Sequence, residues 1–351
     1  MERSQYDPCV YTFRKGKEYG ILGLYVDDLI IAGADKTFNE KLASEIGRFV
    51  TLKEKGENEP FIGIEIKKTE YGFDLSQAHY IDKILKKFAL EECNIVQTPG
   101  DRDQSFDECQ DSKPVDRTLY QEMIGSLMYL ATGTRPDISF NVSNLSRFCN
   151  DAREVHLTGV KRIYRYLKGT RDKMLRYKPS ENSILVSTDA SWCSTSDAKS
   201  YSGYTVKLGN NLISWRSKKQ SLVALSTCEA ELISICEGMC EVKWIKGLLE
   251  ELCKDMRTFL QRLKQIVNLL SSGLNLKKIT SRTKHINRKL YFVKDAVEEG
   301  TIDLEFVRSD EMEADLLTKS LPKEKLKNCI NSLGLTRNSN QNQKWNPRDH
   351  G

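Results

Sequence analysis

Two adjacent acids, Asp27 and Asp28, lie between apolar β-forming residues and are the first candidates for chemistry. Apolar residues precede them at 21–26 and resume at 29–31. This pattern predicts a tight hairpin with both carboxylates at its tip. Carboxylates are the hard oxygen ligands that Mg²⁺ prefers, so the tip is a candidate metal site. Taken alone, the tetrapeptide at 25–28 fits an ordinary solvated hairpin better than a metal site.

The elements around this hairpin form a mixed pattern of helices and strands. Residues 93–117 contain prolines, a glycine and many acids, which favours a linker or surface loop. The apolar spacing predicts helices over 36–50, 77–90, 120–131, 136–147 and 155–168, and a strand over 61–67.

A second domain begins near residue 181, with a short apolar strand leading into Thr188-Asp189-Ala190. A hairpin follows over 201–208 and 212–217. Ser226 and Glu229 have the spacing of a capping box at the start of a long helix. Further along, the sequence predicts a helix over 290–299, a strand over 301–307, a final helix from about 311 and a disordered polar tail over 336–351.

The composition suits a protein that buries a core and leaves several partners open. The 351 residues are 39% hydrophobic and 29% charged, and the net charge is +5. This mild basic excess permits nucleic-acid binding without demonstrating it. The start lacks a secretory signal pattern, and no stretch reaches the length of a membrane span. The ten cysteines and four histidines show no zinc spacing. We expect an intracellular protein, cytoplasmic or nuclear, with no membrane partner.

A series of motifs, taken in order, resembles the C-terminal part of the Pol polyprotein of Copia-type retrotransposons. The resemblance covers roughly residues 1–335 and joins the end of a reverse transcriptase to an RNase H domain. The motifs stand at 7–9, 25–28, 61–65, 75–81, 98–99, 120–130, 134–138, 166–170, 189–192, 200–204, 213–220, 225–231, 283–286 and 314–319.

For the reverse transcriptase half, the resemblance implies that Asp27 and Asp28 are catalytic and bind metal at the hairpin tip. The family takes a further Asp from an earlier strand of the palm. The chain as given begins about two dozen residues before the hairpin. We therefore expect that this chain by itself does not polymerise DNA.

For the RNase H half, the resemblance implies a site for two Mg²⁺ ions held by acids. It assigns catalytic and metal-binding roles to Asp189, Glu231 and Asp315, with Glu229 ranked behind Glu231. The implied partner is an RNA–DNA hybrid. Candidate contacts to it are Arg216, Lys218, Lys219, Lys284 and His285, and the cations of the helix at 155–168; solvated surface residues are the alternative.

One acid of the RNase H pattern is missing. The family has an Asp about twenty residues before Thr283-Lys284-His285-Ile286, whereas the window 261–267 contains Arg262 and Lys264 and no acid. Residues 256–294 contain no Asp or Glu at all. Fewer carboxylates and added cations weaken a divalent metal site. We expect nuclease activity to be greatly reduced or absent, and the change also puts a central strand in doubt.

The fold expected from this resemblance is α/β (α+β). It comprises a truncated reverse transcriptase palm (1–92), a linker (93–117), a helical thumb or connection (118–180), an RNase H-like mixed sheet flanked by helices (181–335) and the tail. The functional hypothesis is a catalytically impaired piece of Copia-type Pol. The alternatives are an active ribonuclease that cuts RNA in RNA–DNA hybrids and a non-enzymatic, domesticated binding protein. The sequence leaves the oligomeric state open.

Overall fold

The computed structural model describes the chain except residues 17, 34, 54–58, 108–110, 181–182, 254–263, 271–286 and 338–351. Its contacts divide the chain into two compact units. The first contains Met1–Lys67 and Cys240–Leu263, and the second contains Lys68–Met239 and Lys264–Gly351. Among the described residues, no helix has both the length and the apolar character needed to cross a membrane.

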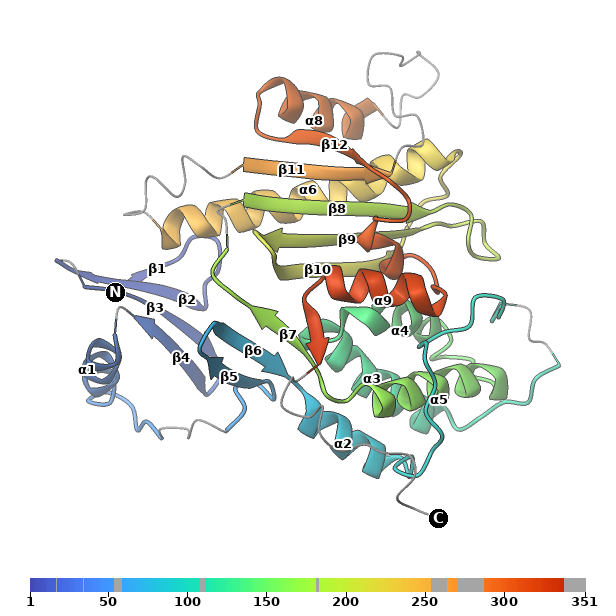
Figure 1. Cartoon of the computed structure of the whole chain (residues 1–351), viewed down its shortest axis with the longest axis horizontal. Helices are drawn as coiled ribbons and strands as arrows, with labels where there is room; N and C mark the ends of the chain where they lie inside the picture. Colours follow the sequence, from blue (N-terminus) through green and yellow to red (C-terminus); the bar gives the residue numbers. More distant parts are fainter. Residues whose placement is uncertain are drawn as a thin grey trace. The chain divides into compact units, whose positions relative to one another are not determined.

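The first unit is built on an antiparallel sheet with strand order β1-β2-β3-β4 (Figure 1). Its strands are β1 (Glu2–Arg3), β2 (Val10–Lys15), β3 (Glu18–Tyr25) and β4 (Asp28–Gly33). Helix α1 (Lys36–Ile46) begins after Asp35, whose carboxylate accepts from the N–H of Phe38. Phe38 and Leu42 are buried, and the Phe38 ring lies 5.6 Å from that of Phe13. The apolar side of α1 therefore covers this sheet.

The second unit contains a five-stranded mixed sheet with the order β10-β9-β8-β11-β12. β8 pairs antiparallel with β9, β9 antiparallel with β10, and β8, β11 and β12 run parallel. The strands are β8 (Ser183–Ser191), β9 (Tyr201–Leu208), β10 (Asn211–Lys219), β11 (Lys264–Leu270) and β12 (Asp303–Val307). The predicted hairpin at 201–217 is confirmed. The doubt about a central strand was misplaced, because β11 lies between β8 and β12.

Helices on both sides complete this sheet. They are α6 (Thr227–Leu252), α8 (Asn287–Glu298), the short 3-10 helix η2 (Glu313–Leu317) and α9 (Lys323–Ser332). The first half of α6 packs closely on β8 and β9, since a Cβ at Gly238 would lie 3.0 Å from a Thr188 methyl. The expected final helix from residue 311 is instead η2 followed by α9.

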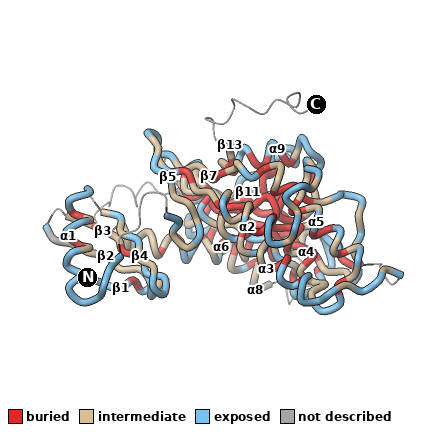
Figure 2. Tube along the Cα trace, turned by 90° about the horizontal axis from the view of Figure 1, so that it is seen from below, coloured by how far each residue is buried: buried red, intermediate tan, exposed pale blue. Residues whose placement is uncertain are grey.

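A helical layer belongs to the same unit. It consists of α2 (Ala78–Lys87), α3 (Arg117–Gly133), η1 (Pro136–Ile138), α4 (Ser139–Ser146) and α5 (Glu154–Gly169). A smaller sheet has the order β13-β7-β6-β5, with β13 (Leu335–Arg337), β7 (Lys173–Tyr177), β6 (Gly72–Ser76) and β5 (Glu65–Thr69). Figure 2 shows the buried residues along α3, α4 and α5.

These compact units do not coincide with the predicted domains. The core of the helical layer continues into the mixed-sheet region through Leu212, Leu316 and Leu326, so 118–180 and 181–335 share one core. The first unit ends at Lys67 instead of residue 92 and takes in part of α6. β13 includes the first two residues of the predicted tail, and the remainder of that tail lies outside the described residues.

The described residues between Cys93 and Asp116 form the predicted loop and belong to no named helix or strand, and the first of them lie against α5 (Glu154–Gly169). Arg165 donates to the Asn94 carbonyl at 2.7 Å and Lys168 to the Cys93 carbonyl at 3.0 Å. Arg162 donates to Thr98 Oγ1 at 3.0 Å. Three of the four α5 cations that were candidates for phosphate binding therefore hold residues 93–98 against the helix, whereas the fourth, Lys161, is exposed.

Candidate functional site

Asp189 lies near the C-terminal end of β8 and is only 2% exposed. It pairs with Gly203 of β9. A Cβ at Gly203 would come within 2.6 Å of Leu317, so glycine is required there for η2 to lie against the sheet. Ser234 of α6 donates to the Asp189 carbonyl at 2.8 Å. Both α6 and η2 therefore meet at the end of β8 where Asp189 lies.

Asp315 reaches this end because Glu313 anchors η2 on the sheet. The buried Glu313 carboxylate accepts from Thr205 Oγ1 at 2.8 Å and from Lys207 Nζ at 2.7 Å. Ser187 of β8 also donates to it at 3.3 Å. Asp315, two residues later, is fully buried. Glu313 was not predicted as part of the site, and its only sequence signal is its place beside the Ala314-Asp315-Leu316 motif.

The two glutamates at the start of α6 have different surroundings. The Glu229 N–H donates to Ser226 Oγ at 3.2 Å, and the Glu229 carboxylate accepts from the Leu225 N–H at 2.7 Å. Glu229 therefore caps the helix, as its spacing predicted. Burial, followed by the charge of Asp189, raises the pKa of Glu231 to about 8. Glu231 thus lies close enough to Asp189 to feel its charge, whereas Glu229 contacts the loop before the helix.

The resulting cluster of Asp189, Glu231 and Asp315 brings together negative charges in a buried place. Burial raises the pKa of Asp189 to about 6, and the neighbouring Asp315 contributes in the same direction. Charged carboxylates are destabilised when they lose water and approach one another. The cluster is therefore a place where cations are favoured.

Two lysines that sequence reasoning missed supply such cations. Lys319 Nζ lies 2.7 Å from Asp315 Oδ1 and 3.7 Å from Asp189 Oδ2. Lys325 of α9 contacts the other Asp315 oxygen, and Thr318 Oγ1 donates to Asp189 Oδ2. Lys319 follows Asp315 by four residues, a spacing that would have suggested a local ion pair.

The acid cluster fits Mg²⁺ in ligand type. Asp315 Oδ1 is buried and lies 2.7 Å from the Lys319 ammonium, so a divalent ion would have to displace or share this contact. As placed, no three His, Cys, Asp or Glu side chains of the described residues converge on one point where an ion would sit. If a divalent ion binds, Asp189, Glu231 and Asp315 are the residues that would hold it.

The missing acid of the RNase H pattern has no counterpart on β11. Leu269 pairs with Thr188, which makes Leu270 level with Asp189 in this parallel ladder. The position level with Asp189 is therefore Leu270, at the end of β11. The predicted window at 261–267 lies before this position in the chain. No acid occurs anywhere in 256–294, so the shift does not restore one.

Asp27 and Asp28 lie in the first unit, at the predicted hairpin. Asp28 pairs with Tyr25, which makes Val26 and Asp27 the two turn residues between β3 and β4. Asp27 is exposed and Asp28 is half-buried. Val26 has a φ of 52°, a value that β-branched residues rarely adopt. The hairpin therefore presents both acids at its tip, as predicted.

The predicted nucleic-acid contacts divide into three groups. Arg216 and Lys218 are exposed on the edge strand β10, and Lys218 pairs with Ser202, which pairs with Ala190 next to Asp189. Lys219 instead forms an ion pair with Asp197 at 2.7 Å. Lys284 and His285 lie outside the described residues.

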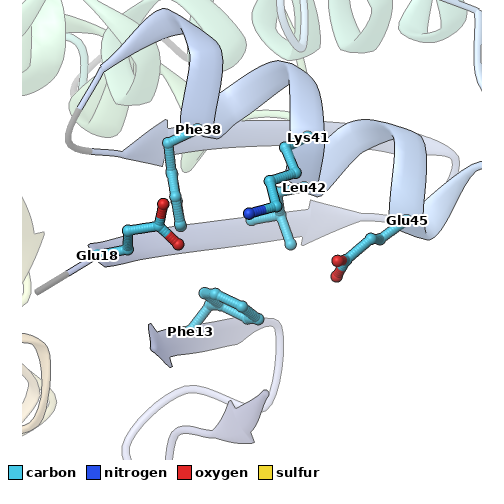
Figure 3. Close-up of a pocket in the computed structure, with 6 residues that line it drawn as sticks. All are labelled: Phe13, Glu18, Phe38, Lys41, Leu42 and Glu45. Carbon is cyan, nitrogen blue, oxygen red and sulfur yellow. The ribbon is translucent and has the colours of Figure 1, made fainter. Parts of the chain in front are cut away.

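A small pocket in the first unit, with a cavity volume of about 10 Å³, contains none of the predicted site residues. Figure 3 shows Phe13, Phe38 and Leu42 around it, with the charged side chains of Glu18, Lys41 and Glu45. It lies between α1 and the sheet and is part of the packing of that helix.

Comparison with known proteins identifies the family. A family model described as "Reverse transcriptase (RNA-dependent DNA polymerase)" matches residues 1–102. The Pol polyprotein of transposon TNT 1-94 from Nicotiana tabacum is 33% identical over 95% of this chain and 26% of its own length. A transposon Ty5-1 protein of Saccharomyces cerevisiae is 32% identical over 63% of this chain and 73% of its own length. The chain belongs to the Pol proteins of Copia-type retrotransposons.

The chain spans about a quarter of the length of the first Copia-type Pol relatives, such as those from TNT 1-94 and from transposon RE1 of Arabidopsis thaliana. Among solved structures, that of the foamy viral protease-reverse transcriptase in complex with RNA/DNA hybrid has a TM-score of 0.47 and 14% identity. That match covers 82% of this chain and 36% of the viral chain.

Proposed function

We propose that the second unit of this Copia-type Pol chain is an RNase H-type domain that binds RNA–DNA hybrids and has lost most of its cleavage activity. The observation that carries the proposal is that Asp189, Glu231 and Asp315 lie near one another in a buried place at the end of β8, while the β11 position level with Asp189 is Leu270 and not an acid. The sheet order supports the RNase H origin, since an antiparallel meander is followed by two parallel strands.

Cleavage of a phosphodiester by such a domain requires divalent ions, which activate the attacking water and stabilise the leaving oxygen. The chain supplies the carboxylates of Asp189, Glu231 and Asp315 to hold them. Lys319 already lies against two of these acids. Because one carboxylate is absent and a cation is present, we infer that ions bind weakly and that turnover is slow.

Binding of the hybrid does not depend on the missing acid. Arg216 and Lys218 project from β10, which lies two strands from β8, or roughly 10 Å at ordinary strand spacing. Ser217 pairs with Gly203 and is level with Asp189, so Arg216 and Lys218 on either side of it project from the other face of the sheet and would contact phosphates along the β10 edge. We infer that they hold a duplex whose backbone passes the acid cluster.

The test is cleavage of a labelled RNA–DNA hybrid by the purified chain in Mg²⁺ or Mn²⁺. We expect little or no cleavage by the native chain and a clear gain for Leu270→Asp, which places a carboxylate level with Asp189. Gln265→Asp is the matched control, because it adds the same charge five residues earlier on the same strand, opposite Ile184. Adding Asp189→Asn to Leu270→Asp should abolish the gain.

The outcomes separate the alternatives. Strong cleavage by the native chain that Asp189→Asn abolishes would show an active ribonuclease and refute the proposed impairment. An equal gain in cleavage for Leu270→Asp and Gln265→Asp would refute the inference that the position level with Asp189 on β11 is the one that lacks an acid. Hybrid affinity that does not fall with rising salt would favour a non-enzymatic binding protein with another partner, because phosphate contacts release counterions.

For the first unit, we infer that Asp27 and Asp28 are the metal-binding pair of the reverse transcriptase region. Two neighbouring carboxylates at an exposed hairpin tip support this role. Because we expect no polymerisation by this chain alone, the test is Mn²⁺ binding to the native chain and to Asp28→Asn, and an unchanged affinity would contradict this role.

A further inference from the structure

The Lys319 ammonium occupies a specific position within the acid cluster. It lies 2.7 Å from Asp315 Oδ1, the oxygen that has no hydrogen bond of normal geometry, and 3.7 Å from Asp189 Oδ2. It thus contacts carboxylates from two elements, η2 and β8. Lys325 contacts only Asp315 among these acids and is further held by the Ser309 carbonyl at 2.7 Å.

The carboxylates that Lys319 contacts are buried, so they depend on its charge. The side chain of Asp315 is fully buried and that of Asp189 is 3% exposed, whereas that of Lys319 is 43% exposed. Buried carboxylates need a nearby cation, and removing one member of such a pair leaves an uncompensated charge. Because Lys319 is partly exposed, its side chain is able to leave without unfolding the sheet.

The missing carboxylate is the reason that lysine side chains can balance the charge of this acid cluster. An RNase H-type site with a further carboxylate would add negative charge to that of Asp189, Glu231 and Asp315. With Leu270 level with Asp189, that charge is absent. The Lys319 ammonium between Asp189 and Asp315, together with the Lys325 ammonium on Asp315, then provides the local counter-charge that divalent ions would otherwise supply.

We propose that Lys319 is the resident counter-ion of this acid cluster: it stabilises the metal-free domain and competes with divalent cations for Asp189 and Asp315. This inference rests on the proposed RNase H origin of the acids and goes beyond it, since it assigns a role to a residue outside the acid set. Lys319 is a positioning residue, because it acts on the carboxylates and not on a substrate.

The test is thermal unfolding of the full chain without nucleic acid, in EDTA and in millimolar Mg²⁺, together with Mn²⁺ binding followed by electron paramagnetic resonance. We expect Lys319→Met to lower the unfolding temperature in EDTA and to gain a larger upward shift with Mg²⁺ than the native chain. Its Mn²⁺ affinity should rise on the order of tenfold, because one like charge has left a partly exposed site.

Three variants serve as controls. Lys327→Met makes the same change on an exposed position of α9 and should alter neither quantity. Lys319→Arg keeps the charge and should restore stability in EDTA. Adding Asp315→Asn to Lys319→Met should remove the response to Mg²⁺.

The proposal is overturned if Lys319→Met is as stable in EDTA as Lys327→Met, or if it binds Mn²⁺ no more tightly than the native chain. Because no nucleic acid is present, these results are independent of hybrid binding. The proposed function is tested separately, by the cleavage and hybrid-binding assays. A result that refutes one proposal therefore leaves the other untouched.

Discussion

At the scale of single residues, the surroundings of a side chain give different roles to chemically identical residues. Glu229 and Glu231 are two positions apart on α6, yet Glu229 caps the helix and Glu231 lies close to Asp189. Two residues on a helix differ by more than half a turn, so they project in different directions. The spacing of Ser226 and Glu229 predicted the cap, whereas the pairing of Glu231 with β8 depends on how α6 packs.

The surroundings of His156 likewise determine its behaviour, and they predict how stability changes with pH. Its Nδ1 accepts from the Arg153 N–H at 3.1 Å, and its Nε2 lies 3.0 Å from the Phe106 carbonyl, to which it donates. The ring stacks on Phe148 at 3.9 Å. Burial lowers the pKa of His156 below its ordinary value near 6.5. Protonation would remove the acceptor at Nδ1 and place a charge at a helix N-terminus.

A histidine with a lowered folded-state pKa stabilises the fold above its unfolded pKa and loses that contribution as pH falls. We therefore expect the free energy of unfolding to decrease as pH falls below about 6.5, by at most about 1.4 kcal/mol per pH unit from this residue. Urea titrations at several pH values should show a smaller decrease for His156→Gln. His79→Gln, at an exposed position, should keep the native pH profile; a profile unchanged by His156→Gln would refute this prediction.

At the scale of elements, a buried ion pair joins η1 to the end of α5. Arg135 donates to both carboxylate oxygens of Asp137, at 2.9 and 2.8 Å, and to Thr170 Oγ1 at 2.6 Å. Tyr166 donates to Asp137 at 2.7 Å. The side chains of Arg135 and Asp137 are essentially inaccessible, at 1% and 0% exposure. The ion pair lies within the turn between α3 and α4, and the contacts to Thr170 and Tyr166 hold this turn against α5.

Asp137→Asn should therefore lower the free energy of unfolding by about 3–5 kcal/mol, because it leaves the buried Arg135 charge without its partner. Arg308 and Asp310 form a control pair with the same spacing at the surface, with side chains 71% and 65% exposed. Asp310→Asn should cost less than about 1 kcal/mol. Chemical denaturation of both variants measures the difference, and similar losses would contradict the importance of burial.

At the scale of the whole molecule, one core spans what the sequence divided into a helical region and an RNase H-like region. Trp215 of β10 donates to the Ala131 carbonyl of α3 at 2.7 Å, and the rings of Phe140 and Tyr201 lie 5.1 Å apart. Asn141 of α4 accepts from Ser320 at 2.9 Å. We infer that these parts of the second unit unfold together.

Leu127→Ala tests this inference, since Leu127 is fully buried in α3. The substitution should lower stability by about 2–5 kcal/mol and accelerate amide hydrogen exchange in β9 and β10 as much as in α5. Leu42→Ala, in the core of the first unit, is the matched control and should leave exchange in β9 unchanged. Faster exchange confined to the helices would show that the two regions are separate domains.

Local features of this protein followed from the sequence because their causes are local. The hairpin at Asp27 and Asp28, the hairpin of β9 and β10 and the cap at Ser226 depend on residues within a few positions of one another. The motifs also identified the Copia-type Pol family, because their residues and their order are properties of the chain itself. The mixed helix and strand content expected from that family is confirmed.

The tertiary structure decided what depends on residues far apart in the chain. The register of β11 against β8 placed Leu270, and not the window at 261–267, level with Asp189. The approach of η2 to the sheet brought Lys319 to Asp189, more than a hundred residues away in sequence. One hydrophobic core contains residues of both the helices and the sheet, so it crosses the domain boundary predicted at residue 180. Strand register and packing arise from contacts between distant segments, which periodicity and motif spacing do not encode.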